Sequence, residues 1–530
     1  MVARPGVFHA GRLPLRRSEV IPPPVHPRKF VRDSVGFAIS QYLVRFLNLV
    51  RGLVAARLLG PAPYGAWSAL LLLFDYGGCA PLGTYQGLDR VVPARIVDGE
   101  PRLLDRAKRA GLFNVLALSL LYAAICFAYF ARSSGQIRTA WGLAGIVLTL
   151  ACVVMTNVSL YHLTLMRSHG KIGAVSAWFL LQSVIGVTLG LALIPTFGAW
   201  GLLWGWVAGT LAATATVMWR GHAVVPLLMA PGPDSNLLLA VGFPMFIYGL
   251  SGFLMRSLDR VIILRFLGTE SLGLYALAVT AVTFLLTLPD AVAYVLYPQL
   301  VRRYRQAMDD PAAIRDLVEQ AVRVLAVGTP ALCAIAYLGA DDIVEWLLPR
   351  FREGVPALRV LCFSAAGLAL SNLASIVLMT LGRQLLLVPV AFGMSALGVF
   401  LDLLAIRTGH GIRGVAWATF VTFVLNSAVL MGLAQWGLGP GLGHRLGFLA
   451  RAFVPLAIAI PLAFGCERLL PGFGLAGPMR ALRLLASASL WVAVYGMLTA
   501  PLVRGIGLRA LAAEFRWPGT VPQPKAPPQD

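Results

Sequence analysis

The chain has 530 residues, a formal net charge of +21, 58% hydrophobic residues and only 13% charged residues. A soluble domain cannot bury that much apolar surface, because the surface of a folded chain grows too fast with its size. The composition therefore excludes a soluble enzyme and predicts an all-α polytopic membrane protein. Nucleic-acid binding is also disfavoured, since the Arg and Lys residues stand at helix ends without interleaved aromatic residues.

About fourteen stretches are long and apolar enough to cross a bilayer, because a spanning helix needs roughly 20 mainly apolar residues. Helices are expected since every backbone group in lipid must find its hydrogen-bond partner within the segment. In chain order, the predicted spans are 34–59, 64–88, 111–131, 139–166, 173–195, 199–219, 236–264, 273–297, 318–340, 356–381, 385–406, 411–436, 448–470 and 481–503.

The first 33 residues are rich in Arg and Pro but contain no apolar run. We therefore expect a cytosolic basic arm rather than a cleaved signal peptide. Counted along the chain, the segments between spans that lie on the same side of the membrane as this arm hold more than twice as many Arg and Lys residues as the segments on the other side. The positive-inside rule then predicts a multi-pass inner-membrane protein with both termini cytoplasmic. The two longer cytosolic connections, 89–110 and 298–317, are predicted to form surface helices against anionic lipid headgroups.

The first span carries a polar stripe at its centre. Arg45 lies about 17 Å along the helix from residue 34. Gln41 and Asn48 fall within about 60° of Arg45, and Arg51 lies further round the same side. A charge at mid-bilayer costs at least about 2.5–3.5 kcal/mol. These residues are therefore predicted to face a wet, substrate-binding cavity, with snorkelling as the alternative reading for Arg45.

The seventh span carries Arg256, Asp259 and Arg260 at i, i+3 and i+4. That spacing predicts one shared helix face. Asp259 can neutralise only one of the two arginines. The face is read either as a cationic wall opposite the first span or as a structural ion pair.

The eighth span has a second polar stripe, predicted to line the same cavity. Its members are spaced three or four residues apart, which is typical of one face of one helix. Pro289 is expected to bend this helix. The stripe consists of Thr280, Thr283, Thr287, Asp290, Tyr294 and Tyr297.

Few acidic residues lie within the predicted spans. Asp75 in the second span, Asp259 and Asp290 are the candidates for coupling transport to protons or sodium. Asp402 in the eleventh span is a further acid that can bind a proton or a cation. Pairing with a nearby arginine is the alternative for Asp75 and the favoured reading for Asp402.

The sequence repeats itself at a nearly constant offset. Residues 57–65 match residues 265–273 at an offset of 208, and residues 197–204 match residues 410–417 at an offset of 213. Matched landmarks in the same order predict two six-helix lobes in parallel repeat around a central cavity, followed by an extra helix pair. The predicted divisions are a basic arm (1–33), a first lobe (34–220), a cytosolic linker (221–235), a second lobe (236–436), the helix pair (437–504) and a cytosolic tail (505–530).

No motif of an enzyme is found. The sequence has no P-loop, GxSxG, HExxH or Cys/His metal spacing, and its six cysteines are scattered through apolar stretches. We therefore predict no catalytic residue, no metal and no cofactor.

Three elements point to a known family. Residues 56–65 resemble the pattern ARxLGxxxYG, residues 258–275 resemble DRxxIxxFLGxxxLGxY, and residues 411–419 resemble GxxGAAxAT. Together they resemble the O-antigen flippase (polysaccharide biosynthesis protein) branch of the multidrug/oligosaccharidyl-lipid/polysaccharide exporter superfamily, which is related to the lipid II flippases.

This resemblance implies a function. It is the flipping of a polyprenyl-pyrophosphate-linked oligosaccharide across the inner membrane by alternating access, for O-antigen and lipopolysaccharide assembly. The implied partners are membrane lipids and a polysaccharide polymerase or glycosyltransferase. First-helix arginines at the same spacing line a cationic lumen in lipid II flippases, so Arg45 and Arg51 are expected to meet the pyrophosphate. The eighth span lacks the arginine found in the lipid II flippases.

Two alternatives stay open. A cation-coupled multidrug exporter of the same superfamily would need an acidic, aromatic cavity, which the excess of membrane arginine disfavours. A membrane enzyme or assembly factor of polysaccharide synthesis is disfavoured by the short outer loops.

Overall fold

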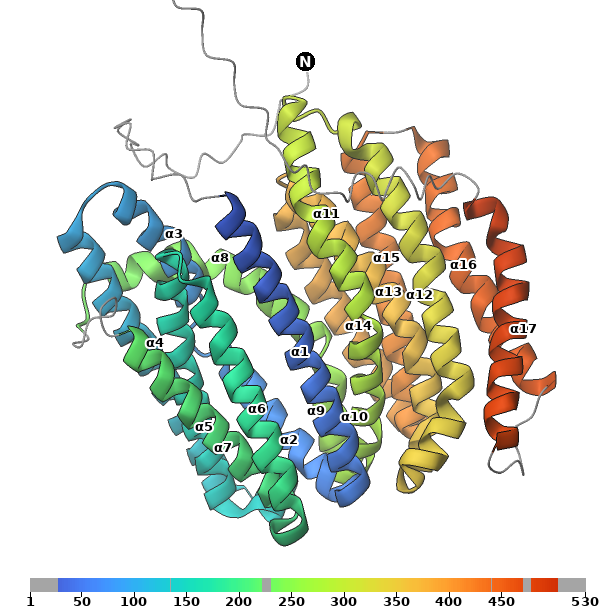
Figure 1. Ribbon diagram of the computed structural model, residues 1–530, viewed down its shortest axis with the longest axis horizontal. Helices are drawn as coiled ribbons and strands as arrows, with labels where there is room; N and C mark the ends of the chain where they lie inside the picture. Colours follow the sequence, from blue (N-terminus) through green and yellow to red (C-terminus); the bar gives the residue numbers. More distant parts are fainter. Residues whose placement is uncertain (1–26, 134, 222–229, 440, 470–477, 504–530) are drawn as a thin grey trace, which may run out of the picture.

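The computed structural model describes residues 27–133, 135–221, 230–439, 441–469 and 478–503, and every regular element in these ranges is a helix (Figure 1). Most of the predicted basic arm and linker and all of the predicted tail lie outside the described residues. The predicted domain boundaries thus stay predictions.

The first half of the chain forms seven helical segments. They are α1 (Pro27–Leu59), α2 (Pro61–Gly77), α3 (Thr84–Val97), α4 (Pro101–Arg132), α5 (Gln136–Ser168), α6 (Ile172–Phe197) and α7 (Ala199–Gly221). We call this group the N-lobe.

The second half repeats the arrangement and adds to it. Its C-lobe comprises α8 (Pro233–Met255), α9 (Leu258–Phe266), α10 (Gly268–Leu285), α11 (Thr287–Gln306), α12 (Ala312–Leu347), η1 (Pro349–Gly354), α13 (Val355–Thr380), η2 (Gln384–Leu386), α14 (Leu387–Arg407) and α15 (Gly411–Gly437). The extra pair, α16 (Leu442–Leu469) and α17 (Pro478–Val503), packs on α12 at the edge of the bundle (Figure 1).

Among the described residues, 12 helices are long and apolar enough to cross a membrane. The first two predicted spans are outside this set. In the first span α1 carries Arg45 and Arg51, and the second span is divided into α2 and α3. The all-helical, multi-pass fold is confirmed, and the predicted count of fourteen stands as an approximation.

The two lobes use the same packing pattern. In the N-lobe α5 packs on α2, α4 and α7, and in the C-lobe α13 packs on α10, α12 and α15. The pair α6–α7 likewise corresponds to α14–α15. The parallel repeat predicted from the sequence offset is therefore visible in the helix neighbours.

Three predicted spans are not single straight helices. The second is broken between Gly77 and Thr84, where Leu82 takes a strained positive φ of 47° and Gly83 one of 94°. The seventh is broken after Met255, and the eighth divides at Leu286. The last break confirms the predicted bend, because Pro289 has no N–H to donate to the preceding turn.

The segments 89–110 and 298–317, predicted to form surface helices, are largely helical. Residues 89–110 form the end of α3 and the start of α4, and residues 298–317 form the end of α11 and the start of α12, with a short turn between the two helices of each pair. Val92 and Ile314 are fully buried in lobe contacts, whereas Ile96 and Val97 are exposed, so the contact of these segments with lipid headgroups stays a prediction.

The lobes close tightly on each other at one end. We call the end where α1 begins the basic end and the other the opposite end. At the opposite end, Gly65 of α2 lies against Thr269, and Gly273 of α10 lies against Pro61. A side chain at either glycine would overlap the backbone of the other lobe, so only glycine permits this approach.

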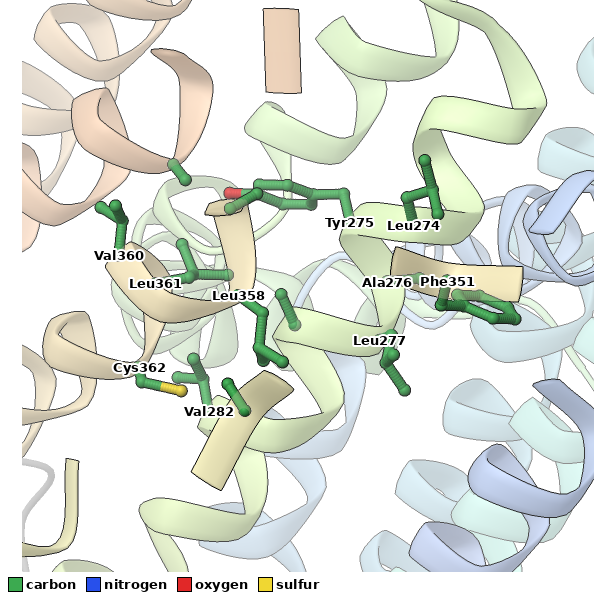
Figure 2. Packing of buried hydrophobic residues seen from close by; sticks show 14 of the residues in the cluster. Leu274, Tyr275, Ala276, Leu277, Val282, Phe351, Leu358, Val360, Leu361 and Cys362 are labelled. Carbon is green, nitrogen blue, oxygen red and sulfur yellow. The ribbon is translucent and has the colours of Figure 1, made fainter. Parts of the chain in front are cut away.

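A wedge from the C-lobe completes this closure. The buried Phe351 of η1 packs edge-on against Tyr64 of α2, with ring centroids 5.9 Å apart. Figure 2 shows Phe351 beside Ala276 and Leu277 of α10, within the apolar cluster that α10 shares with α13. The opposite end is therefore closed in this structure.

At the basic end, α8 joins the N-lobe. Asp234 accepts a hydrogen bond from Arg95 at 2.9 Å and forms an ion pair with Arg106 at 3.3 Å. Gly87 and Gly242 bring the backbones of α3 and α8 together in the same region. The lobes are thus joined through α8 on one flank of the bundle.

Candidate functional site

The stripes predicted on the first and eighth spans face each other. Nη1 of Arg45 on α1 lies 3.1 Å from Oδ2 of Asp290 on α11, and the two side chains are 45% and 33% exposed. Asn372 of α13 donates to the other carboxylate oxygen at 3.2 Å. In Figure 1, α1 runs between the N-lobe helices and α10–α11. This ion pair therefore crosses from one lobe to the other.

The remaining stripe residues of α1 interact locally. Asn48 donates to the backbone carbonyl of Val44 at 2.9 Å. The side-chain nitrogen of Gln41 is buried without a hydrogen-bond partner among the described residues. A buried amide without a partner is costly, so Gln41 has donor capacity available for a ligand or water.

Arg51 lies about 9 Å deeper than Arg45 along α1, at 1.5 Å per residue. Its guanidinium lies over the ring of Trp67 on α2, 5.8 Å from the centroid. Across the described residues, no carboxylate or hydrogen-bond acceptor is paired with it. Arg51 is therefore a cation held by an aromatic face, with its hydrogen bonds unused.

The breaks in the second and seventh spans meet between the lobes. The hydroxyls of Tyr76 and Ser257 are 3.0 Å apart, and the rings of Tyr76 and Phe253 are 5.0 Å apart. This contact brings Asp75 within electrostatic range of Arg260. An acid of the N-lobe and an arginine of the C-lobe thus share one site.

The predicted common face of Arg256, Asp259 and Arg260 is interrupted, because the helix ends at Met255 and restarts at Leu258. Arg256 is exposed and donates to Gly252 of its own helix at 3.2 Å. Arg260 donates to the carbonyl of Arg256 at 3.4 Å. Asp259 points the other way, into the C-lobe.

The stripe of α10–α11 lies on the side turned away from the lobe core. The buried residues of α11 are Pro289, Ala293, Leu296 and Leu300, whereas Thr283, Tyr294 and Tyr297 are exposed. Thr280 and Thr283 donate to carbonyls of their own helix, at 2.9 Å each. Thr287 is half-buried. The tyrosines are thus the accessible hydrogen-bonding groups of this face.

Asp259 enters a buried polar cluster that sequence reasoning missed. One of its oxygens accepts from the hydroxyl of Tyr275 at 2.7 Å, and the other accepts from the backbone N–H of Arg260 at 2.7 Å. The Tyr275 hydroxyl lies 3.1 Å from that of Thr419. Figure 2 shows the ring of Tyr275 extending from α10 between neighbouring helices.

The same cluster contains Asp402, for which pairing with an arginine was the favoured reading. Instead, Asp402 and Asp259 line one small pocket with Thr419 and Thr422. An oxygen of Asp402 and the hydroxyl of Thr422 are buried without a partner among the described residues. The spacing Thr419-x-x-Thr422 on one helix face was the available signal, but nothing in the sequence pairs it with the seventh or eleventh span.

The sequence profile of the polysaccharide biosynthesis protein family matches residues 54–351, more than half of the chain. The chain belongs to this family. No curated protein sequence matches it.

Solved structures with a similar fold are transporters of the MOP superfamily. The lipid II flippase MurJ in an inward closed conformation has a TM-score of 0.61 at 11% identity, covering 88% of this chain and 99% of the flippase. An inward-facing multidrug resistance MATE family transporter has a TM-score of 0.60 at 15% identity, covering 78% and 98%.

A third similar structure is a MOP superfamily transporter from Pyrococcus furiosus Vc1, described as having a binding pocket of reverse polarity. Its TM-score is 0.54 at 15% identity, covering 79% of this chain and 95% of that one. At these identities the likeness establishes the fold alone.

Proposed function

We propose that this member of the polysaccharide biosynthesis protein family flips a polyprenyl-pyrophosphate-linked oligosaccharide across the inner membrane by alternating access. The observation that carries the proposal is Arg51. It is a guanidinium between two lobes, deep in a membrane protein, without an acidic partner in the described part of the chain. Such a charge is retained at depth where an anionic ligand can reach it.

The arginines supply the chemistry that a diphosphate needs. A guanidinium donates two parallel hydrogen bonds to phosphate oxygens and keeps its charge at any physiological pH. We propose that Arg45 and Arg51 meet the pyrophosphate, with Arg256 and Arg260 on the facing wall. Asn48 and Gln41 contribute polar surface next to them.

The flank between α1 and α11 suits the lipid tail. The exposed residues Ile39, Leu43 and Phe46 lie on the basic half of α1, and Leu288 and Val295 lie on α11. An apolar chain can remain against these residues while the sugars occupy the polar side beside Tyr294 and Thr283. Head and tail then cross the membrane in different environments.

The direction of transport follows from the distribution of charge. The positive-inside rule places the basic end in the cytosol and with it both termini. Because the contact of Gly65 with Gly273 closes the opposite end, we assign the structure to a state that accepts substrate from the cytosolic leaflet. Outward release then requires α2 and α10 to separate.

The buried pocket of Asp259 and Asp402 is our candidate for ion coupling. One oxygen of Asp402 and the hydroxyl of Thr422 have no partner among the described residues, which is a setting in which a proton or a sodium ion can bind. Asp75 and Asp290 remain the other coupling candidates, both next to arginines. Under this proposal Asp402→Asn abolishes the dependence of flipping on an imposed proton or sodium gradient and leaves substrate binding intact.

The test is flipping of a labelled polyprenyl-pyrophosphate oligosaccharide in proteoliposomes, with Arg51→Gln compared with the wild type. Arg57→Gln is the matched control, since Arg57 is on the same helix but exposed at the opposite end. We expect the wild type and the control to flip the lipid and Arg51→Gln to lose most of the rate. Equal rates in all three would refute the phosphate site, and no flipping by the wild type would refute the proposed function.

A second candidate is a cation-coupled exporter of organic cations, which the similarity to MATE family structures favours. An organic cation would be repelled by the unpaired Arg51 and by Arg256. Transport of a fluorescent cationic dye that exceeds transport of the lipid would support this candidate instead.

A further inference from the structure

Asp290 is distinctive among the acids of the cavity. In the described part of the chain, it is the one carboxylate that forms an ion pair with any of the four arginines assigned above to the pyrophosphate. Its partner is Arg45, 3.1 Å away, on the other lobe. Arg51, about two helical turns deeper, has no such partner.

The carboxylate of Asp290 is bound in the way that a phosphate oxygen would be bound. Arg45 donates from a guanidinium, and Asn372 donates from a side-chain amide at 3.2 Å. Both are donors that suit an oxyanion, because charge-assisted hydrogen bonds form equally well to carboxylates and phosphates. The side chain therefore occupies the position of an anionic ligand.

The pair is also easily exchanged. Both side chains are accessible at the protein surface, at 45% and 33% exposure. Exposed ion pairs hold their partners weakly. A diphosphate, with more charge and more acceptor oxygens, competes well for Arg45, whereas a neutral lipid head offers nothing that can replace the carboxylate.

The position of the pair gives the exchange a structural consequence. α1 packs on α6 of the N-lobe and meets α10 of the C-lobe deeper in the bundle. Its basic half exposes Ile39, Leu43 and Phe46. Among described residues, Arg45 to Asp290 is the sole side-chain hydrogen bond between α1 and the C-lobe. Breaking it releases the basic half of α1 from α11.

We propose that Asp290 is a built-in counter-anion, which occupies Arg45 in the empty protein and which an incoming diphosphate displaces. This inference rests on the proposed function. It makes Asp290 a specificity residue: lipids with a diphosphate head break the bond between the lobes, and neutral lipids of the same tail do not.

The experiment measures equilibrium binding of a polyprenyl pyrophosphate without sugars, and of the corresponding polyprenol, to the purified full chain in detergent. Asp290→Asn removes the competing charge. We expect its Kd for the diphosphate lipid to fall about threefold to fivefold, the range of an exposed ion pair. The Kd for the polyprenol should not change.

Two further variants isolate the pair. In the Arg45→Gln background, Asp290→Asn should bring no gain, because the site for which it competes is gone. Asp89→Asn is the matched control, since Asp89 forms an exposed ion pair with Arg167 away from the cavity, with side chains 38% and 54% exposed. It should bind like the wild type. Asp290→Ser serves in place of Asp290→Asn if the latter does not fold.

The outcomes separate this inference from the proposed function. Unchanged or weaker diphosphate binding in Asp290→Asn, with weaker binding in Arg45→Gln, overturns the counter-anion and leaves the phosphate site standing. Equal effects on diphosphate lipid and polyprenol also overturn it, because they show a structural role. Diphosphate binding that is unaffected by Arg45→Gln and Arg51→Gln contradicts the phosphate site itself.

Discussion

The two lobes carry the same contact of three residues, which we call a triad, with opposite charge. In the N-lobe, Arg51 lies over Trp67, and Trp67 packs edge-on against Trp206, with centroids 5.5 Å apart. The positions related by the repeat are Asp259, Tyr275 and Thr419, and they too touch in that order. The scaffold is therefore conserved between the halves while the chemistry is reversed.

This difference between the two lobes shows that one backbone arrangement can hold either a cation or an anion. The indole ring of Trp67 offers a negative face, which suits a guanidinium and accepts no proton. The phenol of Tyr275 offers an O–H donor, which suits a carboxylate. With all three positions changed, the same arrangement holds an arginine over an indole in the N-lobe and a buried acid beside a phenol in the C-lobe.

The largest effect is expected at the charged end of the N-lobe triad. Arg51→Gln should lower the rate of lipid flipping about 10-fold to 100-fold, because a charge-assisted hydrogen bond contributes about 1.5–3 kcal/mol. Thermal stability in detergent should be unchanged, since among the described residues Arg51 forms no ion pair that the substitution would break. A large loss of stability would instead make Arg51 a structural residue.

The glycine pair at the opposite end should respond symmetrically. Gly65→Val and Gly273→Val each place a side chain into the backbone of the other lobe, and overpacking of this kind typically costs about 1–3 kcal/mol. We expect both variants to open the opposite end. Labelling of a cysteine introduced at Thr269 should then increase by a similar factor in each. A strong effect of only one of the two substitutions would contradict the equivalence of the two lobes at this contact.

Removing the hydroxyl of the C-lobe triad should destabilise the protein. Tyr275→Phe leaves Asp259 without its side-chain donor, and a buried acceptor without a partner costs about 1–3 kcal/mol. The melting temperature in detergent should fall, and Asp259→Asn in the same background should recover part of the loss. No fall in melting temperature would show that water replaces the phenol.

The smallest effect is expected at the corresponding residue of the N-lobe. Trp67→Phe keeps an aromatic face under Arg51 but weakens the cation–π contact, which is about 0.5–1 kcal/mol at such sites. Flipping should fall by no more than about fivefold, and the melting temperature should fall only slightly, because Trp67 is buried and phenylalanine fills most of its site. A larger fall in melting temperature for Trp67→Phe than for Tyr275→Phe would contradict this ranking of the two triads.

Several features of this protein were determined by the sequence alone. The polar stripes of α1 and α10–α11 follow from the 3.6-residue period, which fixes the residues that share a face within one helix. The repeat follows from the matched offsets of 208 and 213, and the bend of the eighth span follows from Pro289. Each is a property of a short segment or of a comparison between segments.

Other features were decided only by the tertiary structure. Arg45 meets Asp290 across 245 positions of sequence, and the pocket of Asp259 and Asp402 draws on four elements, α8, α9, α14 and α15. The break at Arg256 also left the carboxylate of Asp259 bonded to Tyr275 and to the backbone N–H of Arg260 rather than to an arginine side chain. Periodicity defines a face of a helix but not the helix that it meets, because that choice depends on the packing of the whole bundle.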